Sequence, residues 1–275
     1  MGKRNGKSSF YYGWVIVAVI ALAGFTQTAQ TFPVWGVLLK PITEDMGWSR
    51  TIFSGAMGVG TLMGAVLALI AAPTLDRFGA RWPMVTGFAV IGLTLVLMAW
   101  MNDIWQFYVL LVIGRTIHLG VVSIGQESTI PKWFIAKRGT AVGIGASGNR
   151  IGSTITPLYA QAIITLAGWR PSLVVIGIVV WLASMIPVAL FLRSRPEDMG
   201  MRPDGIPIRD ENEPESRPNS GEPPDIRDVS FTRAEALRLR SFYSFMFVNT
   251  ILFIVVPTTS LHFVPFLTDI GLSPE

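Results

Sequence analysis

Two arginines lie inside long apolar segments of this sequence, where a permanent positive charge is costly. Arg115 lies near the middle of the segment 105–130, and Arg150 lies well inside the segment 139–166. A guanidinium group stays protonated, and its burial costs several kcal/mol unless it meets water, a carboxylate or an anionic ligand. Glu127 is the only carboxylate in these two segments and cannot neutralise both arginines. The excess of positive charge therefore favours a negatively charged small ligand.

A structural role for the same arginines remains open. In that interpretation Arg115 donates hydrogen bonds to backbone carbonyls, while Arg150 pairs with Glu127 or extends its charged end to the membrane surface. His118 and Gln126 follow Arg115 on nearly the same helical face. They therefore join Arg115 and Arg150 as candidate ligand contacts.

Polar side chains also interrupt the first apolar segment, residues 13–39. Gln27, Gln30 and Thr31 share one helical face, and Pro33 after them predicts a kink near the middle of the membrane. Amides and hydroxyls are costly in hydrocarbon unless they have partners. We therefore expect this face to look into a helix bundle or a water-filled cavity, where it contacts either other helices or the ligand.

These residues depend on membrane-spanning helices for their placement. The chain has 275 residues, of which 51% are hydrophobic and only 15% charged, and its mean hydropathy is +0.49. This composition lies outside the range of ordinary soluble domains. About 20 apolar residues cross a bilayer, and seven segments are long enough: 13–39, 51–75, 82–101, 105–130, 139–166, 171–192 and 242–267. We therefore predict an all-α membrane protein with a six-helix bundle and a seventh transmembrane helix.

Small residues recur at every fourth position in two of these segments, which is a pattern typical of helices whose backbones approach closely. They are Ala56, Gly60, Gly64, Ala68 and Ala72 in the second segment, and Gly148, Gly152, Thr156 and Ala160 in the fifth. The pattern is consistent with static packing and also with surfaces that slide or rock.

A short charged turn, here called the elbow (residues 76–81), separates the second and third segments. It contains Asp76, Arg77, Gly79 and Arg81, and its glycine allows the chain to reverse direction within a few residues. One interpretation is a positively charged topology anchor. The other is a gate that latches the neighbouring helix ends together.

Basic residues are distributed unequally between alternate connections. One side would hold Lys3, Arg4, Lys7, Arg77, Arg81, Lys132, Lys137 and Arg138, and the other side only Lys40, Arg50 and Arg170. By the positive-inside rule, the amino terminus is expected to be cytoplasmic. We expect a multi-pass protein of the plasma (inner) membrane.

The composition divides the chain into four parts. We expect a cytoplasmic amino terminus at residues 1–12, the six-helix bundle at 13–192, a cytoplasmic linker at 193–240 and a further helix in 241–275. The linker is rich in Pro, Glu, Asp and Arg, cannot bury a core and is expected to be largely disordered.

Several other functions are disfavoured. The chain has no cysteine and only two histidines, His118 and His262, so we expect no metal site and no organic cofactor. No lysine follows Lys137, which argues against a retinal protein. The spans contain no aspartate pair and no serine–histidine arrangement suited to hydrolysis, so we do not expect an enzyme. The basic residues form short clusters between spans rather than one face, so no nucleic-acid partner is expected.

Taken together, these residues resemble the amino-terminal half of a major facilitator superfamily transporter. The elbow is similar to the superfamily signature GxxxDRxGxR, with Ala72 where the first glycine is usual. Arg115 is similar to the arginine of the fourth-helix signature, although Gly120 comes one position later than usual. Residues 143–157 resemble the glycine-rich fifth-helix signature.

Other short stretches resemble the oxalate/formate antiporter and monocarboxylate-porter branch. They are Tyr12-Gly-Trp, Lys40-Pro-Ile, Gly47-Trp-Ser-Arg, Trp133-Phe134, Lys137-Arg138-Gly139 and Pro196-Glu-Asp-Met-Gly. The resemblance implies secondary active transport of small mono- or dicarboxylates by alternating access, as a proton-coupled symporter or as an antiporter. Arg115 and Arg150 would bind the carboxylate, Gln27, Gln30, Thr31, His118 and Gln126 would line the site, and the elbow would act as the gate.

Transporters of this superfamily have two six-helix bundles with the substrate between them. The resemblance makes the seventh helix of this chain the first helix of the second bundle. We therefore expect the chain to require the remaining carboxy-terminal half and to transport poorly alone, whether it is a fragment, a truncated product or one of two assembling chains. A non-transporting regulator derived from a transporter, or a truncated remnant, is the alternative.

Overall fold

The computed structural model describes residues 11–205, 235, 237–252 and 255. The chain divides into two compact units, Met1–Glu222 and Pro223–Glu275. In the second unit, residues 240–252 are helical, and most of the predicted seventh span, 242–267, lies outside the described residues. The described residues of both units contain no β-strand. The prediction of an all-α protein is thus confirmed.

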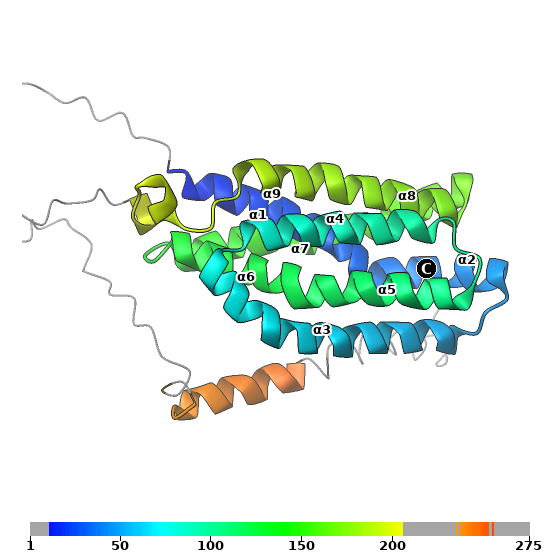
Figure 1. The fold of residues 1–275 in the computed structure, drawn as a ribbon, viewed down its shortest axis with the longest axis horizontal. Helices are drawn as coiled ribbons and strands as arrows, with labels where there is room; N and C mark the ends of the chain where they lie inside the picture. The colour runs from blue at the N-terminus through cyan, green and yellow to red at the C-terminus, as the bar shows by residue number, and fades with distance from the viewer. Residues whose placement is uncertain (1–10, 206–234, 236, 253–254, 256–275) are drawn as a thin grey trace, which may run out of the picture. The chain divides into compact units, whose positions relative to one another are not determined.

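The first unit is a bundle of long helices that run side by side (Figure 1). Three of the long helical segments, here called rods, are each divided into two α-helices by a short turn of 3-10 or π helix. In chain order the elements are α1 (Gly13–Gln27), the 3-10 turn η1 (Thr28–Gln30), α2 (Phe32–Met46), α3 (Arg50–Phe78), α4 (Arg81–Met98), α5 (Ile104–Ile117), the π-helical turn η2 (His118–Val122), α6 (Ser123–Trp133), α7 (Arg138–Ala167), α8 (Trp169–Val180), the π-helical turn η3 (Trp181–Met185), α9 (Ile186–Phe191) and the 3-10 turns η4 (Pro196–Met199) and η5 (Pro203–Gly205).

Five helical stretches among the described residues are long and apolar enough to cross a membrane. They are Gly13–Met46, Arg50–Phe78, Arg81–Met98, Ile104–Trp133 and Trp169–Phe191. α7 has 30 residues, a length of about 45 Å at 1.5 Å per residue. It is not among the five because glycines, hydroxyls and Arg150 lower its hydropathy.

Thr31 breaks the first rod where the sequence predicts a kink. Its backbone is extended, with φ −96° and ψ 161°, and α2 restarts at Phe32 with Pro33 in its first turn. Proline lacks an N–H group and is tolerated at a helix start but not inside the hydrogen-bond ladder. The break therefore follows from the sequence, and it leaves carbonyl groups of η1 without helical partners.

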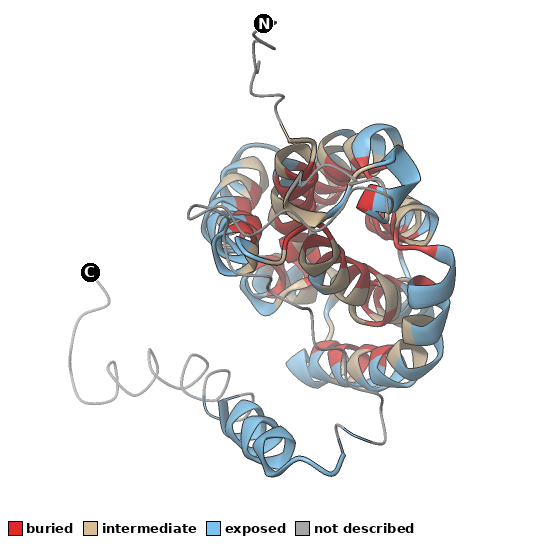
Figure 2. Cartoon of the chain, turned by 90° about the vertical axis from the view of Figure 1, so that its left-hand side faces the viewer, coloured by how far each residue is buried: buried red, intermediate tan, exposed pale blue. Residues whose placement is uncertain are grey.

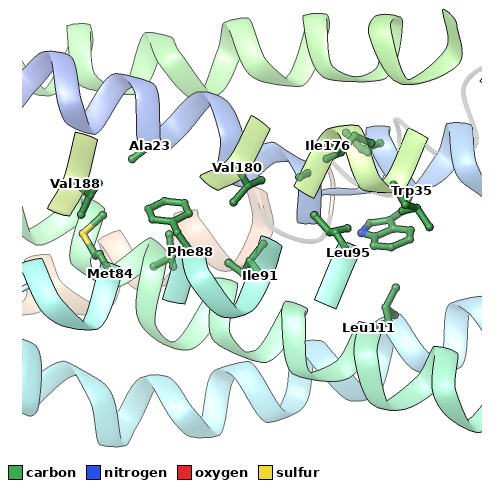
Figure 3. Close-up of a cluster of buried hydrophobic side chains, with 14 of the residues drawn as sticks. Ala23, Trp35, Met84, Phe88, Ile91, Leu95, Leu111, Ile176, Val180 and Val188 are labelled. Carbon is green, nitrogen blue, oxygen red and sulfur yellow. The ribbon is translucent and has the colours of Figure 1, made fainter. Parts of the chain in front are cut away.

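Apolar side chains from several rods fill the middle of the bundle. Phe88, Ile91 and Leu95 of α4 lie towards Val180 and Ile176 of α8, and all five side chains are buried (Figure 3). Exposed residues cover the outer surfaces of the helices (Figure 2). Because lipid tails are as apolar as leucine, close packing rather than removal of water holds such a bundle together.

The predicted small-residue rows lie at two close helix contacts. A Cβ atom at Gly148 of α7 would collide with the carbonyl oxygen of Ala21 in α1, and one at Gly152 would collide with that of Phe25. On α3, a Cβ atom at Gly60 would lie only 2.9 Å from the Cβ of Arg115. Glycine at these positions lets α7 approach α1, and α3 approach α5, at backbone distance.

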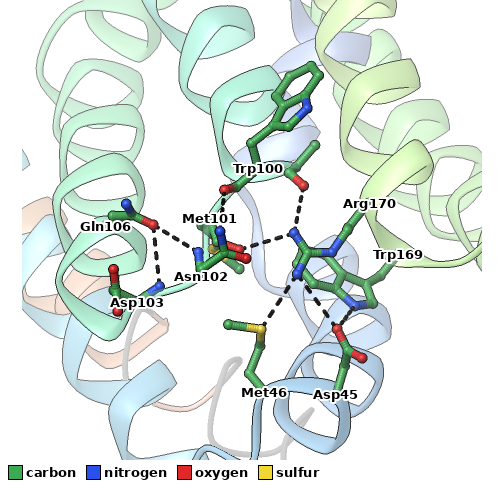
Figure 4. A network of polar contacts seen from close by, with 10 residues as sticks. Asp45, Met46, Trp100, Met101, Asn102, Asp103, Gln106, Trp169 and Arg170 are labelled. Atoms are coloured by element: carbon green, nitrogen blue, oxygen red, sulfur yellow. Dashed lines mark hydrogen bonds and ion pairs between the residues drawn. The ribbon is translucent and has the colours of Figure 1, made fainter.

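A polar network (Figure 4) lies at the α4–α5 connection, at the end of the bundle opposite the elbow (Figure 1). Arg170 donates from Nη1 to the carbonyl oxygens of Ala99 at 2.9 Å and Met101 at 3.1 Å. Its Nη2 lies 3.9 Å from Asp45 Oδ2, which also accepts from Trp169 Nε1 at 3.1 Å. One arginine therefore ties the end of α2 to the α4–α5 connection and the start of α8.

The first part of the predicted linker packs against the elbow end of the bundle. The indole nitrogen of Trp133 donates to the carbonyl of Arg193 at 3.1 Å. The Asp204 carboxylate accepts from the backbone N–H groups of Ile135 at 2.8 Å and Ala136 at 2.7 Å. Residues 193–205 therefore have fixed contacts, which the composition of the whole linker did not indicate.

Candidate functional site

Arg115 is buried where three rods meet, with 5% of its surface exposed. Its Nε donates to the hydroxyl of Thr61 in α3 at 3.0 Å, and its Nη1 donates to the backbone carbonyl of Gln30 at the helix break. The ring of Phe32 lies 4.8 Å from the guanidinium carbon. These contacts fix both the position and the direction of the positive charge.

The local sequence explains each contact. The break at Thr31 interrupts the hydrogen-bond ladder, so the Gln30 carbonyl is available to Arg115. Gly60 has no side chain at the point where α3 meets Arg115, so the adjacent Thr61 hydroxyl comes within hydrogen-bond distance. α5 supplies the arginine itself just before the π-helical turn η2.

The charge of Arg115 has no carboxylate partner among the residues that the structure describes. The ion pairs found there are Lys40–Glu44, Lys132–Asp76 and Arg170–Asp45. The Nη2 group of Arg115 donates to none of the described residues. Arg115 thus donates to a backbone carbonyl, as expected if its role were structural. However, no described carboxylate neutralises its charge, and its Nη2 group has no partner among the described residues.

Several predicted site residues have buried side-chain oxygen or nitrogen atoms without a hydrogen-bond partner in the described part of the chain. These atoms are Gln27 Oε1, Gln30 Oε1, Gln126 Oε1 and His118 Nδ1. A buried acceptor that lacks a hydrogen bond costs about 1–3 kcal/mol, and such groups commonly meet water or a ligand. Thr31 differs, because its hydroxyl donates to the Thr28 carbonyl at 2.6 Å.

Not all predicted residues come together. The predicted common face of Arg115, His118 and Gln126 is interrupted by η2, since a π-helical turn rotates the helix that follows it. Gln126 donates instead to the carbonyl of Ile20 in α1 at 3.1 Å. Arg150 is exposed on α7, and no ion pair joins it to the exposed Glu127 in the described structure.

The elbow joins the ends of four helices. Gly79 adopts φ 85°, in the region that favours glycine, and ends α3. Asp76 pairs with Lys132 at the end of α6 over 3.2 Å, and Arg81 donates from Nε to the carbonyl of Ala189 in α9 at 3.2 Å. The Arg77 side chain is exposed and lies 5.3 Å from the Phe78 ring.

Sequence reasoning missed four side chains that complete these clusters. Thr61 and Phe32 contact Arg115, while Lys132 and Arg195 contact Asp76. Each contact joins residues far apart in the chain. Helical periodicity relates only residues on the same helix, so no pattern in the sequence pointed to these pairs.

The amino-acid sequence also matches a known family. The sequence model of the Major Facilitator Superfamily matches residues 13–274. This chain belongs to the major facilitator superfamily. Superfamily membership, together with the apolar helices, makes it an integral, multi-pass membrane protein of a transporter family rather than an enzyme.

Three similar proteins illustrate the range of names among the relatives of this chain. The chain is 28% identical over 179 residues to the probable anion transporter 4, chloroplastic, of Arabidopsis thaliana, covering 62% of this chain and 33% of that protein. It is 28% identical over 138 residues to the probable L-galactonate transporter of Escherichia coli strain K12, covering 50% and 30%. It is 24% identical over 182 residues to the membrane sensor protein UhpC of Salmonella typhimurium, covering 66% and 38%. The chain therefore spans about a third of the length of these relatives.

Proposed function

We propose that this chain forms the anion-binding bundle of a secondary active transporter for small organic anions, namely mono- or dicarboxylates. The observation that carries the proposal is the buried Arg115, whose charge lacks a carboxylate partner among the described residues and whose Nη2 group is unused. An anion that docks there neutralises the charge and accepts charge-assisted hydrogen bonds. The relatives named as anion and L-galactonate transporters support this substrate class.

Arg115 binds the carboxylate in this scheme, and its hydrogen bonds to Thr61 and to the Gln30 carbonyl hold the guanidinium group in place. Thr61 and the Gln30 carbonyl occupy Nε and Nη1, so the anion meets Nη2. The unpaired amide oxygens of Gln27, Gln30 and Gln126 and the unpaired Nδ1 of His118 lie along the same helices, where they form hydrogen bonds with water or with the substrate. Arg150, exposed on α7, provides a second positive contact on the outer surface of the bundle.

Alternating access requires the bundle, residues 13–192, to move as one body against the remaining carboxy-terminal half. The elbow serves as the gate, because its contacts to Lys132 and Ala189 hold the ends of α3, α4, α6 and α9 together. With the amino terminus cytoplasmic, the elbow faces the cytoplasm of a plasma (inner) membrane protein. In antiport, an exchanged anion restores the charge balance at Arg115 when the substrate leaves; in proton-coupled symport, a proton bound together with the anion offsets the negative charge of the substrate.

Replacement of Arg115 by glutamine tests this proposal. Hydrogen bonds to charged groups contribute about 1.5–3 kcal/mol, so R115Q should weaken binding of acetate, benzoate or oxalate by at least about tenfold. Isothermal titration with the protein in nanodiscs measures the affinity, and R50Q, at the start of α3, is the matched control. Unchanged affinity in R115Q would remove Arg115 from the site.

A sensor without transport activity is the second candidate, because one relative is named a membrane sensor protein. Such a protein binds the anion at Arg115 but moves no substrate. Uptake of radiolabelled oxalate into proteoliposomes that hold the chain together with its carboxy-terminal half separates the two, since a transporter gives flux that R115Q abolishes. Flux through the 275-residue chain alone would contradict the expectation that a carboxy-terminal half is required.

A further inference from the structure

We propose that Phe32 is the specificity-determining cover of the Arg115 site. In this role its ring shields the guanidinium group in the absence of ligand and lies beside the body of the bound anion. The inference rests on the proposed anion site at Arg115. It adds a residue that controls which anions reach the charge.

Arg115 and Phe32 differ sharply in exposure although their side chains are in contact. Arg115 is 5% exposed, whereas 58% of the Phe32 surface is exposed, and the ring lies 4.8 Å from the guanidinium carbon. A cation over an aromatic face at this distance is an attractive contact. The ring therefore covers one face of the guanidinium group.

The helix break determines where this ring lies. Thr31 is extended and Phe32 is the first residue of α2, so the ring stands at a helix start rather than inside a packed helix. Phe32 has no place among the buried residues of the core. Rotation of the ring away from Arg115 consequently breaks the cation–π contact without opening a cavity in the core.

Two of the three nitrogen atoms of the guanidinium group already donate to the protein. Thr61 accepts from Nε, and the Gln30 carbonyl accepts from Nη1. α3 approaches the arginine stem directly, since a Cβ atom at Gly60 would lie 2.9 Å from the Arg115 Cβ. An anion that binds the unused donors must therefore lie next to the exposed Phe32 ring.

The Arg115 charge and the Phe32 ring together distinguish carboxylates that have an apolar body from compact, strongly hydrated anions. A carboxylate with an apolar body keeps its charged end on Arg115 and its body against the ring. Sulfate and phosphate are compact and strongly hydrated, and one donor edge beside an apolar ring does not replace their hydration shell. The site therefore favours benzoate over sulfate, and Phe32 is the residue that produces this preference.

The rate at which an arginine-specific reagent modifies Arg115 tests whether Phe32 covers this residue, and the assay does not depend on transport. The protein in nanodiscs is treated with phenylglyoxal, and the modified Arg115 peptide is quantified by mass spectrometry. F32A should speed modification of Arg115 about fivefold, the factor expected from loss of one exposed cation–π contact, and F32W should restore slow modification. F191A, which removes another exposed phenylalanine ring at the end of α9, is the matched control. An unchanged rate in F32A would overturn the proposal.

The affinity ratio of benzoate to sulfate, measured by isothermal titration, tests the selectivity. F32A should lower this ratio several-fold, whereas F191A should leave it unchanged. If modification accelerates but neither anion binds the wild-type protein, the cover stands and the anion-transport proposal fails. If both anions bind but F32A changes neither the rate nor the ratio, the anion site stands and the role of Phe32 is refuted.

Discussion

Replacing Gly148 by alanine should weaken the packing of the bundle, because this glycine lies where α7 meets the backbone of α1. The added Cβ atom would collide with the carbonyl oxygen of Ala21 and lie 2.8 Å from its Cα. Both obstacles are backbone atoms, which cannot rotate away as a flexible side chain can. The helices must therefore separate or shift.

The matched control is Gly143→Ala on the same helix, at an exposed position with no atom within 4 Å of the added Cβ. Both substitutions gain the helix propensity of alanine over glycine, about 1 kcal/mol. The difference between the two variants therefore isolates the packing cost. Overpacking of a close contact typically costs about 1–3 kcal/mol, so G148A should be less stable than G143A by that amount.

Steric trapping in bicelles measures the free energy of unfolding of each variant. G148A should fall below wild type or match it, and G143A should match or exceed wild type. Equal free energies of unfolding for the two variants would refute the close α1–α7 contact. A more stable G148A would refute it as well.

Three further predictions use the same kind of measurement or the binding assay. R170Q should destabilise the bundle by about 1.5–3 kcal/mol, because it removes charged donors from two backbone carbonyls. R81Q should cost a similar amount at the elbow, whereas D76N, which loses only an exposed ion pair, should cost less than about 1 kcal/mol; a larger loss in D76N than in R81Q or R170Q would contradict this order. T61V should weaken benzoate binding less than R115Q does, since Thr61 only positions the arginine; an equal loss in isothermal titration would make Thr61 a direct contact instead.

Long apolar segments alone determined much of the fold. Six of the predicted spans are helices in the described structure, and the polar interruption before Pro33 marks a real break at Thr31. The elbow signature and Arg115 carry the resemblance to the superfamily, and the match of the family model confirms it. These features depend on local composition and on helical period, which can be read along the chain.

The tertiary structure was needed to show which glycines of α7 pack against another helix. Gly143 and Gly148 both lie on α7, but only Gly148 is buried against α1. In a membrane, the helix faces that meet lipid and those that meet protein are both apolar. Hydropathy therefore does not separate the packed face from the exposed face.

The contacts of Arg115 also depend on the tertiary structure. The sequence indicated a buried charge that lacked enough carboxylates, but Thr61, Phe32 and the Gln30 carbonyl come from two other rods. The π-helical turn after Arg115 also redirects Gln126 to α1. The sequence by itself determined which charge is buried, since that depends on one helix. The tertiary structure decided which of its donor groups are occupied, since that depends on how separate helices pack.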